Sequence, residues 1–202
     1  GLVFFYLINV VEQGLFRMLG VQIDPGPVGA FGHYAHPVII YQAMGGMVVL
    51  VLLGLYNGRR HLRDVWNKAL GIDTTVRDDD EMLSYRQAVL GLAGGVLVMT
   101  LWLWRAGLPL WIVPLLLFAC FVVFLTISRV VVEGGVAVMF PPITGPDVTA
   151  AALGTRALGS SGVASVSSSY VWGTDVLILL MTSCANGLKL ADRFVQRKRR
   201  LF

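Results

Sequence analysis

Two residues of opposite charge, Arg129 and Glu133, stand at the end of a long apolar stretch. A separation of four residues places both side chains on one face of a helix, where they can form an ion pair. Charge close to the hydrocarbon of a membrane is costly, so the chain must use it for folding or for function. Two interpretations stay open: an ion pair that holds helices together, or a pair that meets a substrate, proton or ion.

Glycines and prolines between residues 134 and 146 follow this pair and predict a break in helical structure. An unwound segment at membrane depth exposes backbone carbonyls and helix ends to a ligand. Thr144 and Asp147 flank the last break, and we expect Asp147 to be the N-cap of a short helix that runs to about Ala157. The candidate residues of a substrate or ion path, or of a structural ion pair, are therefore Arg129, Glu133, Asp147 and Thr144.

Other combinations of reactive residues give little support to catalysis. The sequence shows no Ser/His/Asp arrangement, phosphate-binding loop, zinc motif or dinucleotide fingerprint. His33 and His36 lie three residues apart in a loop, but two imidazoles do not complete a metal site. Cys120 and Cys184 stand isolated in apolar stretches. We therefore predict neither enzymatic activity nor a bound cofactor or metal.

The composition places these residues in a membrane protein. Hydrophobic residues make up 56% of the 202 residues and charged residues only 14%, whereas about a quarter of the residues of a soluble domain are charged. Basic residues gather in two short clusters, namely Arg59, Arg60, Arg63 and Lys68, and then Lys189, Arg193, Arg197, Lys198, Arg199 and Arg200. Such clusters are typical of cytoplasmic segments that contact anionic lipid, and they argue against nucleic acid as a partner.

Four apolar stretches have the length of membrane-spanning helices, which is about 20 residues. They cover residues 1–19, 37–56, 85–106 and 110–132. Ser84 and Gln87 form the pattern of a capping box at the start of the third stretch. Residues 59–70 carry apolar residues at spacings of three and four, which predicts an amphipathic helix on the membrane surface.

The distribution of positive charge predicts how the chain crosses the membrane. It places the connection after residue 56 and the C-terminal tail on the cytoplasmic side. Since the stretch 110–132 returns to that side, residues 133–188 must cross an even number of times, or enter the membrane and come back. Their glycine, proline and serine content favours a broken or re-entrant region near 133–170, because irregular backbone at membrane depth needs surrounding protein or a water-filled cavity. A loop on the membrane surface is the alternative.

Several motifs in the second half of the chain resemble those of a known family. They are Ser84-Tyr85-Arg86, Val89-Leu90-Gly91, Ser128-Arg129, Glu133-Gly134-Gly135 and Gly145-Pro146-Asp147. Residues 84–200 resemble the C-terminal part of a group of large bacterial polytopic membrane proteins of unknown function, some of them described as similar to oligopeptide transporters. The resemblance implies a polytopic membrane fold and carries little information on activity. Ser128 and Gly134 depart from the family pattern, which often has threonine and alanine there, but the charged pair is intact.

These observations predict an all-α, polytopic transmembrane helix bundle. We expect residues 1–202 to form a single membrane domain, the C-terminal portion of a larger multi-pass protein of the cell inner membrane, with a cytoplasmic C-terminus. The predicted function is part of a secondary transporter for a small polar or peptide-like solute. The alternatives are a non-catalytic accessory subunit of a membrane complex, and a membrane enzyme that acts on lipid. The expected partners are the lipid bilayer, with anionic lipid at the basic clusters, and either other membrane subunits or the preceding part of the same protein.

Overall fold

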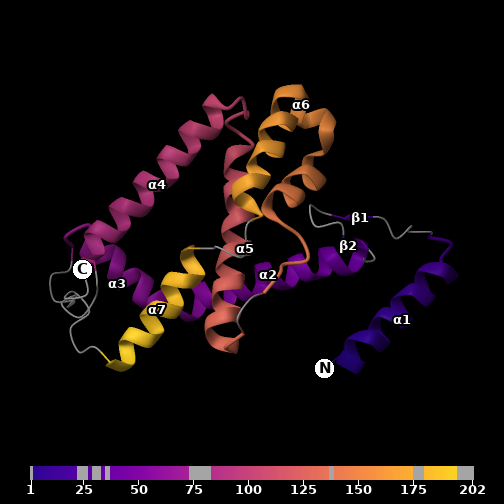
Figure 1. Ribbon diagram of the computed structural model, residues 1–202, viewed down its shortest axis with the longest axis horizontal. Helices are drawn as coiled ribbons and strands as arrows, with labels where there is room; N and C mark the ends of the chain where they lie inside the picture. The colour runs from indigo at the N-terminus through magenta and orange to yellow at the C-terminus, as the bar shows by residue number, and fades with distance from the viewer. Residues whose placement is uncertain are drawn as a thin grey trace.

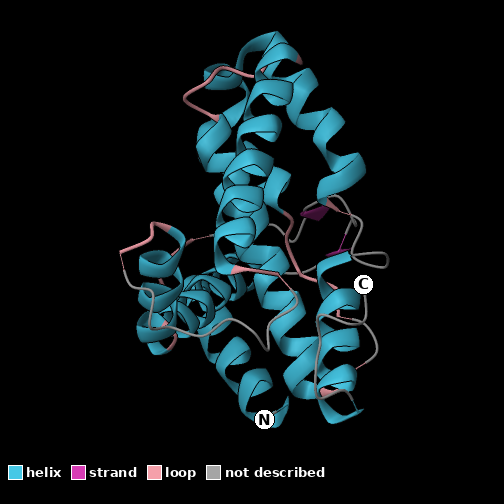
Figure 2. Cartoon of the chain, turned by 90° about the vertical axis from the view of Figure 1, so that its left-hand side faces the viewer, coloured by secondary structure: helices cyan, strands magenta, loops and turns pink. Residues whose placement is uncertain are grey.

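The computed structural model is α-helical, as the sequence predicts (Figure 1, Figure 2). It describes residues 2–21, 27–28, 33–34, 37–72, 83–136, 139–174 and 180–194. The helices in this part of the chain are α1 (Leu2–Met18), α2 (Pro37–Asn57), α3 (Arg59–Ala69), α4 (Tyr85–Arg105), α5 (Val113–Gly134), α6 (Gly145–Gly173) and α7 (Leu180–Phe194). Two short antiparallel strands, β1 (Pro27–Val28) and β2 (His33–Tyr34), lie between α1 and α2.

Among the described residues, three helices are long and apolar enough to cross a membrane: Ile40–Asn57 within α2, all of α4 and all of α5. They correspond to the predicted spans at 37–56, 85–106 and 110–132. The first predicted span coincides with α1, whose 17 residues lie at the short end of the range of lengths that cross a bilayer, and α1 is not among these three helices. Together with the composition, these helices indicate a membrane protein.

Helix α4 begins where the sequence predicts. The side chain of Ser84 accepts a hydrogen bond from the backbone of Gln87, and the side chain of Gln87 accepts one from the backbone of Ser84, each at 3.3 Å. These two bonds satisfy backbone donors that have no partner inside the first turn of a helix.

Helix α5 is the scaffold of the fold. It contacts α2, α4, α6 and α7, and Figure 1 shows it standing between α4 and α6 with α2 crossing it. Eleven of its residues are buried, and two apolar clusters among the described residues are built around them. The first cluster joins α5 to α2, and the second joins α5 to α4 and α6. The elements that carry the candidate residues are thus positioned by a single helix.

Helix α6 doubles back on itself (Figure 1). Gly154 and Gly159 interrupt it with φ values of +69° and +67°. Residues other than glycine rarely adopt this backbone conformation. The hydroxyl of Tyr170 donates a hydrogen bond of 2.6 Å to Asp147 Oδ1. Residues 23 positions apart would be separated by roughly 34 Å in a continuous helix. The bond therefore closes the base of a helical hairpin, here named the α6 hairpin.

One prediction about this region was wrong, and another agrees with the structure. Asp147 is not the N-cap: Thr144 holds that position and Asp147 lies three residues further, where its carboxylate accepts from the backbone N–H of Thr144. The predicted end near Ala157 agrees with the break at Gly159, whose backbone is not helical, but the sequence did not predict that helical structure resumes there and reaches Gly173. The position of the α6 hairpin relative to a membrane stays a prediction.

Candidate functional site

Arg129 and Glu133 form the ion pair that their spacing allows, with 2.9 Å between Arg129 Nε and Glu133 Oε1. Their side chains are 36% and 65% exposed, so this pair is not a dry, buried one. Arg129 also reaches across to α2, where its Nη1 donates to the carbonyl oxygen of Leu50 at 3.3 Å. The guanidinium therefore joins two helices, in addition to pairing within its own.

Gly54 makes this crossing possible. A Cβ atom at Gly54 would lie 2.6 Å from Nη1 of Arg129, so any larger residue would displace the guanidinium. One turn before Arg129, Thr126 Oγ1 donates to the carbonyl oxygen of Met47 at 3.5 Å. Thr126 and Arg129 of α5 thus both bind the backbone of α2. Sequence reasoning missed Gly54, whose only signal is a small residue within an apolar helix.

The end of α5 is joined to α7 as well. The hydroxyls of Ser128 and Thr182 lie 3.1 Å apart and share a hydrogen bond. The ammonium of Lys189 donates to the carbonyl oxygen of Val132, in the last turn of α5, where carbonyl groups lack partners within the helix. One residue of the second basic cluster therefore satisfies a helix end.

A second group of polar residues gathers at the base of the α6 hairpin. Thr144 Oγ1 donates to Asp147 Oδ2 at 2.5 Å, and Tyr170 binds the other carboxylate oxygen. Thr144 is fully buried and Asp147 is 9% exposed. The carboxylate lies in the first turn of the helix, where the helix dipole favours negative charge. No pattern in the sequence pointed to Tyr170, because only the reversal of the chain brings it to Asp147.

This cluster, here named the base cluster (Thr144, Asp147 and Tyr170), lies against the middle of α5. A Cβ atom at Gly145 would lie 2.8 Å from the backbone nitrogen of Cys120 and 2.9 Å from its Cα. Cys120 is seven residues after the start of α5, which is roughly 10 Å along the helix. Close approach of two backbones through glycine is the packing that membrane helices favour. The close approach at Gly145 thus determines where along α5 the base cluster packs.

The four candidate residues fall into two separate sites. Arg129 lies nine residues after Cys120 on α5, which is about 13 Å along the helix axis, and its described partners are on α2 and α5. Thr144 and Asp147 bind each other and α6. The structure brings the residues together as two pairs and does not form a single constellation.

The turn of the α6 hairpin is tied to the connection between α4 and α5. Ser161 Oγ donates to the carbonyl oxygen of Gly107 at 3.0 Å, and Ser165 Oγ donates to that of Ala106 at 2.5 Å. These serines satisfy carbonyl groups just past the end of α4. Two serines of the region 133–170 therefore join helices.

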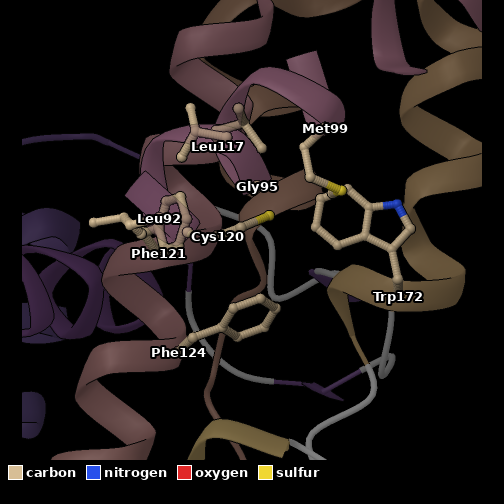
Figure 3. A pocket seen from close by; sticks show the side chains of 10 residues that line it. Leu92, Gly95, Met99, Leu117, Cys120, Phe121, Phe124 and Trp172 are labelled. Atoms are coloured by element: carbon tan, nitrogen blue, oxygen red, sulfur yellow. The ribbon is translucent and has the colours of Figure 1, made fainter. Parts of the chain in front are cut away.

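An apolar pocket of about 340 Å³ lies between α4, α5 and the end of α6 (Figure 3). Its lining residues are Gly91, Leu92, Gly95, Val96, Met99, Leu117, Cys120, Phe121, Phe124 and Trp172. The spacing of Gly91 and Gly95 is typical of close packing between membrane helices, but a Cβ atom at either would meet nothing within 4 Å. These glycines border open space in this chain.

The structure offers no candidate metal centre among its described residues, since no three His, Cys, Asp or Glu side chains gather there. His36 and the side chain of His33 lie outside the part of the chain that it describes.

Comparison with known proteins places the chain in a family. The model of a family of unknown function, DUF6785, matches residues 1–202. The chain belongs to this family. No curated protein and no solved structure matches it. The family match extends over the whole chain, beyond the resemblance at residues 84–200, and a bacterial origin and a likeness to oligopeptide transporters stay predictions.

Proposed function

We propose that this DUF6785 chain is part of a secondary transporter of the inner membrane, that it takes a small polar or peptide-like solute, and that the α6 hairpin lines the solute path. Many such transporters bind their substrate near the middle of the bilayer, at discontinuous helices whose N-termini point at the site. Support comes from the non-helical residues 139–144, which lead to a helix that starts against the middle of α5.

The observation that carries this proposal is the hydrogen bond between Tyr170 and Asp147. It joins the two ends of a broken helix through a carboxylate, a group whose acceptor capacity changes when it binds a proton or a cation. In the proposal, neutralising Asp147 weakens its bonds to Thr144 and Tyr170 and lets the two arms of the hairpin separate. This gives the chain a polar element that can open and close at mid-depth.

Arg129 and Glu133 have a structural part in this proposal. Arg129 holds α5 against α2 through Leu50, and neither residue lines the apolar pocket. An exposed ion pair contributes little by itself. We therefore assign the path to the base cluster, and we assign the ion pair to the frame that keeps α5 fixed while the hairpin moves.

Uptake into proteoliposomes tests the proposal. The full-length protein is reconstituted, and accumulation of radiolabelled dialanine and of free alanine is followed with and without a proton gradient. We expect uptake by the unaltered protein, loss of uptake in Asp147→Asn, and retained uptake in Glu133→Gln as the matched control. Absence of uptake of both probes by the unaltered protein, or equal loss in the two variants, would contradict the proposal.

An accessory subunit is the second candidate, and the exposed apolar faces favour it. Only 6% of the α4 span is buried, and α1 exposes large apolar side chains such as Phe4, Tyr6 and Val11. Lipid or partner helices must cover these faces. Native mass spectrometry of the full-length protein distinguishes the two: a stoichiometric protein partner favours the accessory role, and lipid alone favours the transporter.

A further inference from the structure

We propose that one face of α3 docks on the anionic headgroup surface of the bilayer. The face, here named the α3 face, consists of Leu62, Trp66 and Leu70 with Arg59 and Arg63 beside them. An amphipathic helix of this kind buries its apolar stripe at the boundary between headgroups and acyl chains, while its basic residues bind anionic lipid.

Exposure shows that the protein leaves this face open. Leu62, Trp66 and Leu70 are 46%, 57% and 58% exposed. They follow one another at intervals of four residues, so they form one stripe along the helix and its last turn. Contiguous exposed apolar side chains mark a surface that meets a partner or a membrane.

Helix α4 contacts α3 on a side of α3 that does not carry the apolar stripe. The ring of His61 packs edge-on against the ring of Tyr85 at the start of α4, with 5.9 Å between their centroids. Val65, four residues after His61, is half-buried on the same side. Because the stripe of Leu62 and Trp66 lies on another side of the helix, α4 holds α3 in place without covering it.

The positive charge of α3 favours an anionic lipid surface as the partner of the α3 face. Helix α3 carries Arg59, Arg60, Arg63 and Lys68 against a single acidic residue, Asp64. Arg59 and Arg63 are one turn apart, which sets both beside the apolar stripe, and Asp64 follows on the far side of the helix. The acidic run 78–81 lies outside the described residues.

The junction of α2 and α3 fixes one of these cations. The guanidinium of Arg59 lies 4.0 Å from the centroid of the Tyr56 ring and donates to the carbonyl oxygen of Tyr56 at 3.0 Å. Stacking on an aromatic ring holds a cation at low cost. Arg59 is thus anchored at the end of a candidate span, where lipid headgroups begin.

The place of α3 in the chain puts it at membrane level. Residue Gly58 alone separates it from the span in α2, and its contact with Tyr85 joins it to the first turn of the span in α4 (Figure 1). Two spans that end beside α3 keep it within reach of the interface. Tryptophan side chains concentrate at that level of a membrane.

Spin labels on two sides of α3 test this proposal in the full-length protein. Leu62→Cys labels the α3 face, and Arg60→Cys, two residues earlier, labels the other side as the matched control. Both are made on Cys184→Ser, because Cys184 is exposed and Cys120 is buried. Relaxation by oxygen, which concentrates in lipid, and by a water-soluble nickel chelate is measured in vesicles of phosphatidylcholine, with and without phosphatidylglycerol.

We expect the label at position 62 to respond more to oxygen and the label at position 60 more to nickel. Adding phosphatidylglycerol should increase the preference at position 62, and Arg63→Gln should reduce that increase about fivefold. Greater response to nickel at position 62 in both lipids would place the face in water and overturn the proposal. Protection of position 62 from both reagents would show a protein partner on this face, and it would overturn the proposal as well. Neither readout depends on transport.

Discussion

Helices α4 and α5 have nearly the same length and are both apolar enough to cross a membrane, yet only 6% of the α4 span is buried against 56% of the α5 span. Small and polar residues on partner helices explain the difference. Gly54 and Gly145 let other segments approach α5 closely, whereas a Cβ atom at Gly91, Gly94 or Gly95 of α4 would meet nothing within 4 Å. Apolar composition brings a helix into the membrane, but close approach and side-chain hydrogen bonds decide what packs against it.

The largest expected effect comes from filling the closest approach to α5. Gly145→Val should lower the free energy of unfolding by about 3 kcal/mol, because the new side chain would collide with the backbone of Cys120. The matched control, Gly94→Val, should change it by less than about 1 kcal/mol. Denaturant unfolding in detergent measures both changes. Equal losses of stability in the two variants would contradict the difference in packing between α4 and α5.

The next effect concerns the base cluster. Asp147→Asn should cost about 2 kcal/mol of stability, because the amide offers one acceptor oxygen where the largely buried carboxylate uses two. Tyr170→Phe should cost about 1 kcal/mol, because it removes the bond from the Tyr170 hydroxyl. The two changes share one bond, so the double variant should lose about 1 kcal/mol less than the sum. Strict additivity would mean that this bond does not hold the α6 hairpin closed.

The ion pair should matter less than the bridge to α2. Arg129→Gln should cost about 1 kcal/mol, since it removes the bond to Leu50 as well as the ion pair. Glu133→Gln should cost less than about 0.5 kcal/mol, because the pair is exposed. Gly54→Ala should displace the guanidinium and therefore lower the free energy of unfolding about as much as Arg129→Gln. The double variant should lose little more stability than either single variant. A larger loss in Glu133→Gln than in Arg129→Gln would assign the stabilisation to the ion pair.

The smallest expected effect is a gain in stability from a substitution in α4. Gly95→Ala should raise the free energy of unfolding by about 0.5 to 1 kcal/mol, because alanine favours the helix and the new methyl group enters the open pocket. Gly107→Ala is the matched control and should destabilise, since Gly107 has a φ of +98° and Ser161 lies against it. A loss in Gly95→Ala would show that another segment covers this face of α4.

Much of the fold follows from local signals in the sequence. The spans in α2, α4 and α5 are runs of apolar residues, and the capping box at Ser84 involves positions only three apart. Such signals depend only on residues within one helix, so they can be recognised without knowledge of the rest of the chain. The same reasoning failed for Asp147, because a threonine and an aspartate at that spacing are compatible with either residue as the cap.

The candidate sites depended on contacts over long stretches of sequence. Arg129 binds a carbonyl group 79 residues away, and Asp147 binds a hydroxyl 23 residues away. Neither partner has a pattern that points to it. The roles of Gly54 and Tyr170 depend on the tertiary structure, in which α2 crosses α5 and α6 turns at its two glycines.

The sequence by itself determined that this is an apolar, helical chain, where its spans lie, and that Arg129 and Glu133 can pair. These features depend on hydrophobicity and on helical spacing, which neighbouring residues define. Only the tertiary structure decided that Arg129 bridges two helices and that Asp147 closes a hairpin at mid-depth of α5. The physical reason is that hydrogen bonds between distant segments depend on backbone approach, and here glycines set that approach where side chains would prevent it.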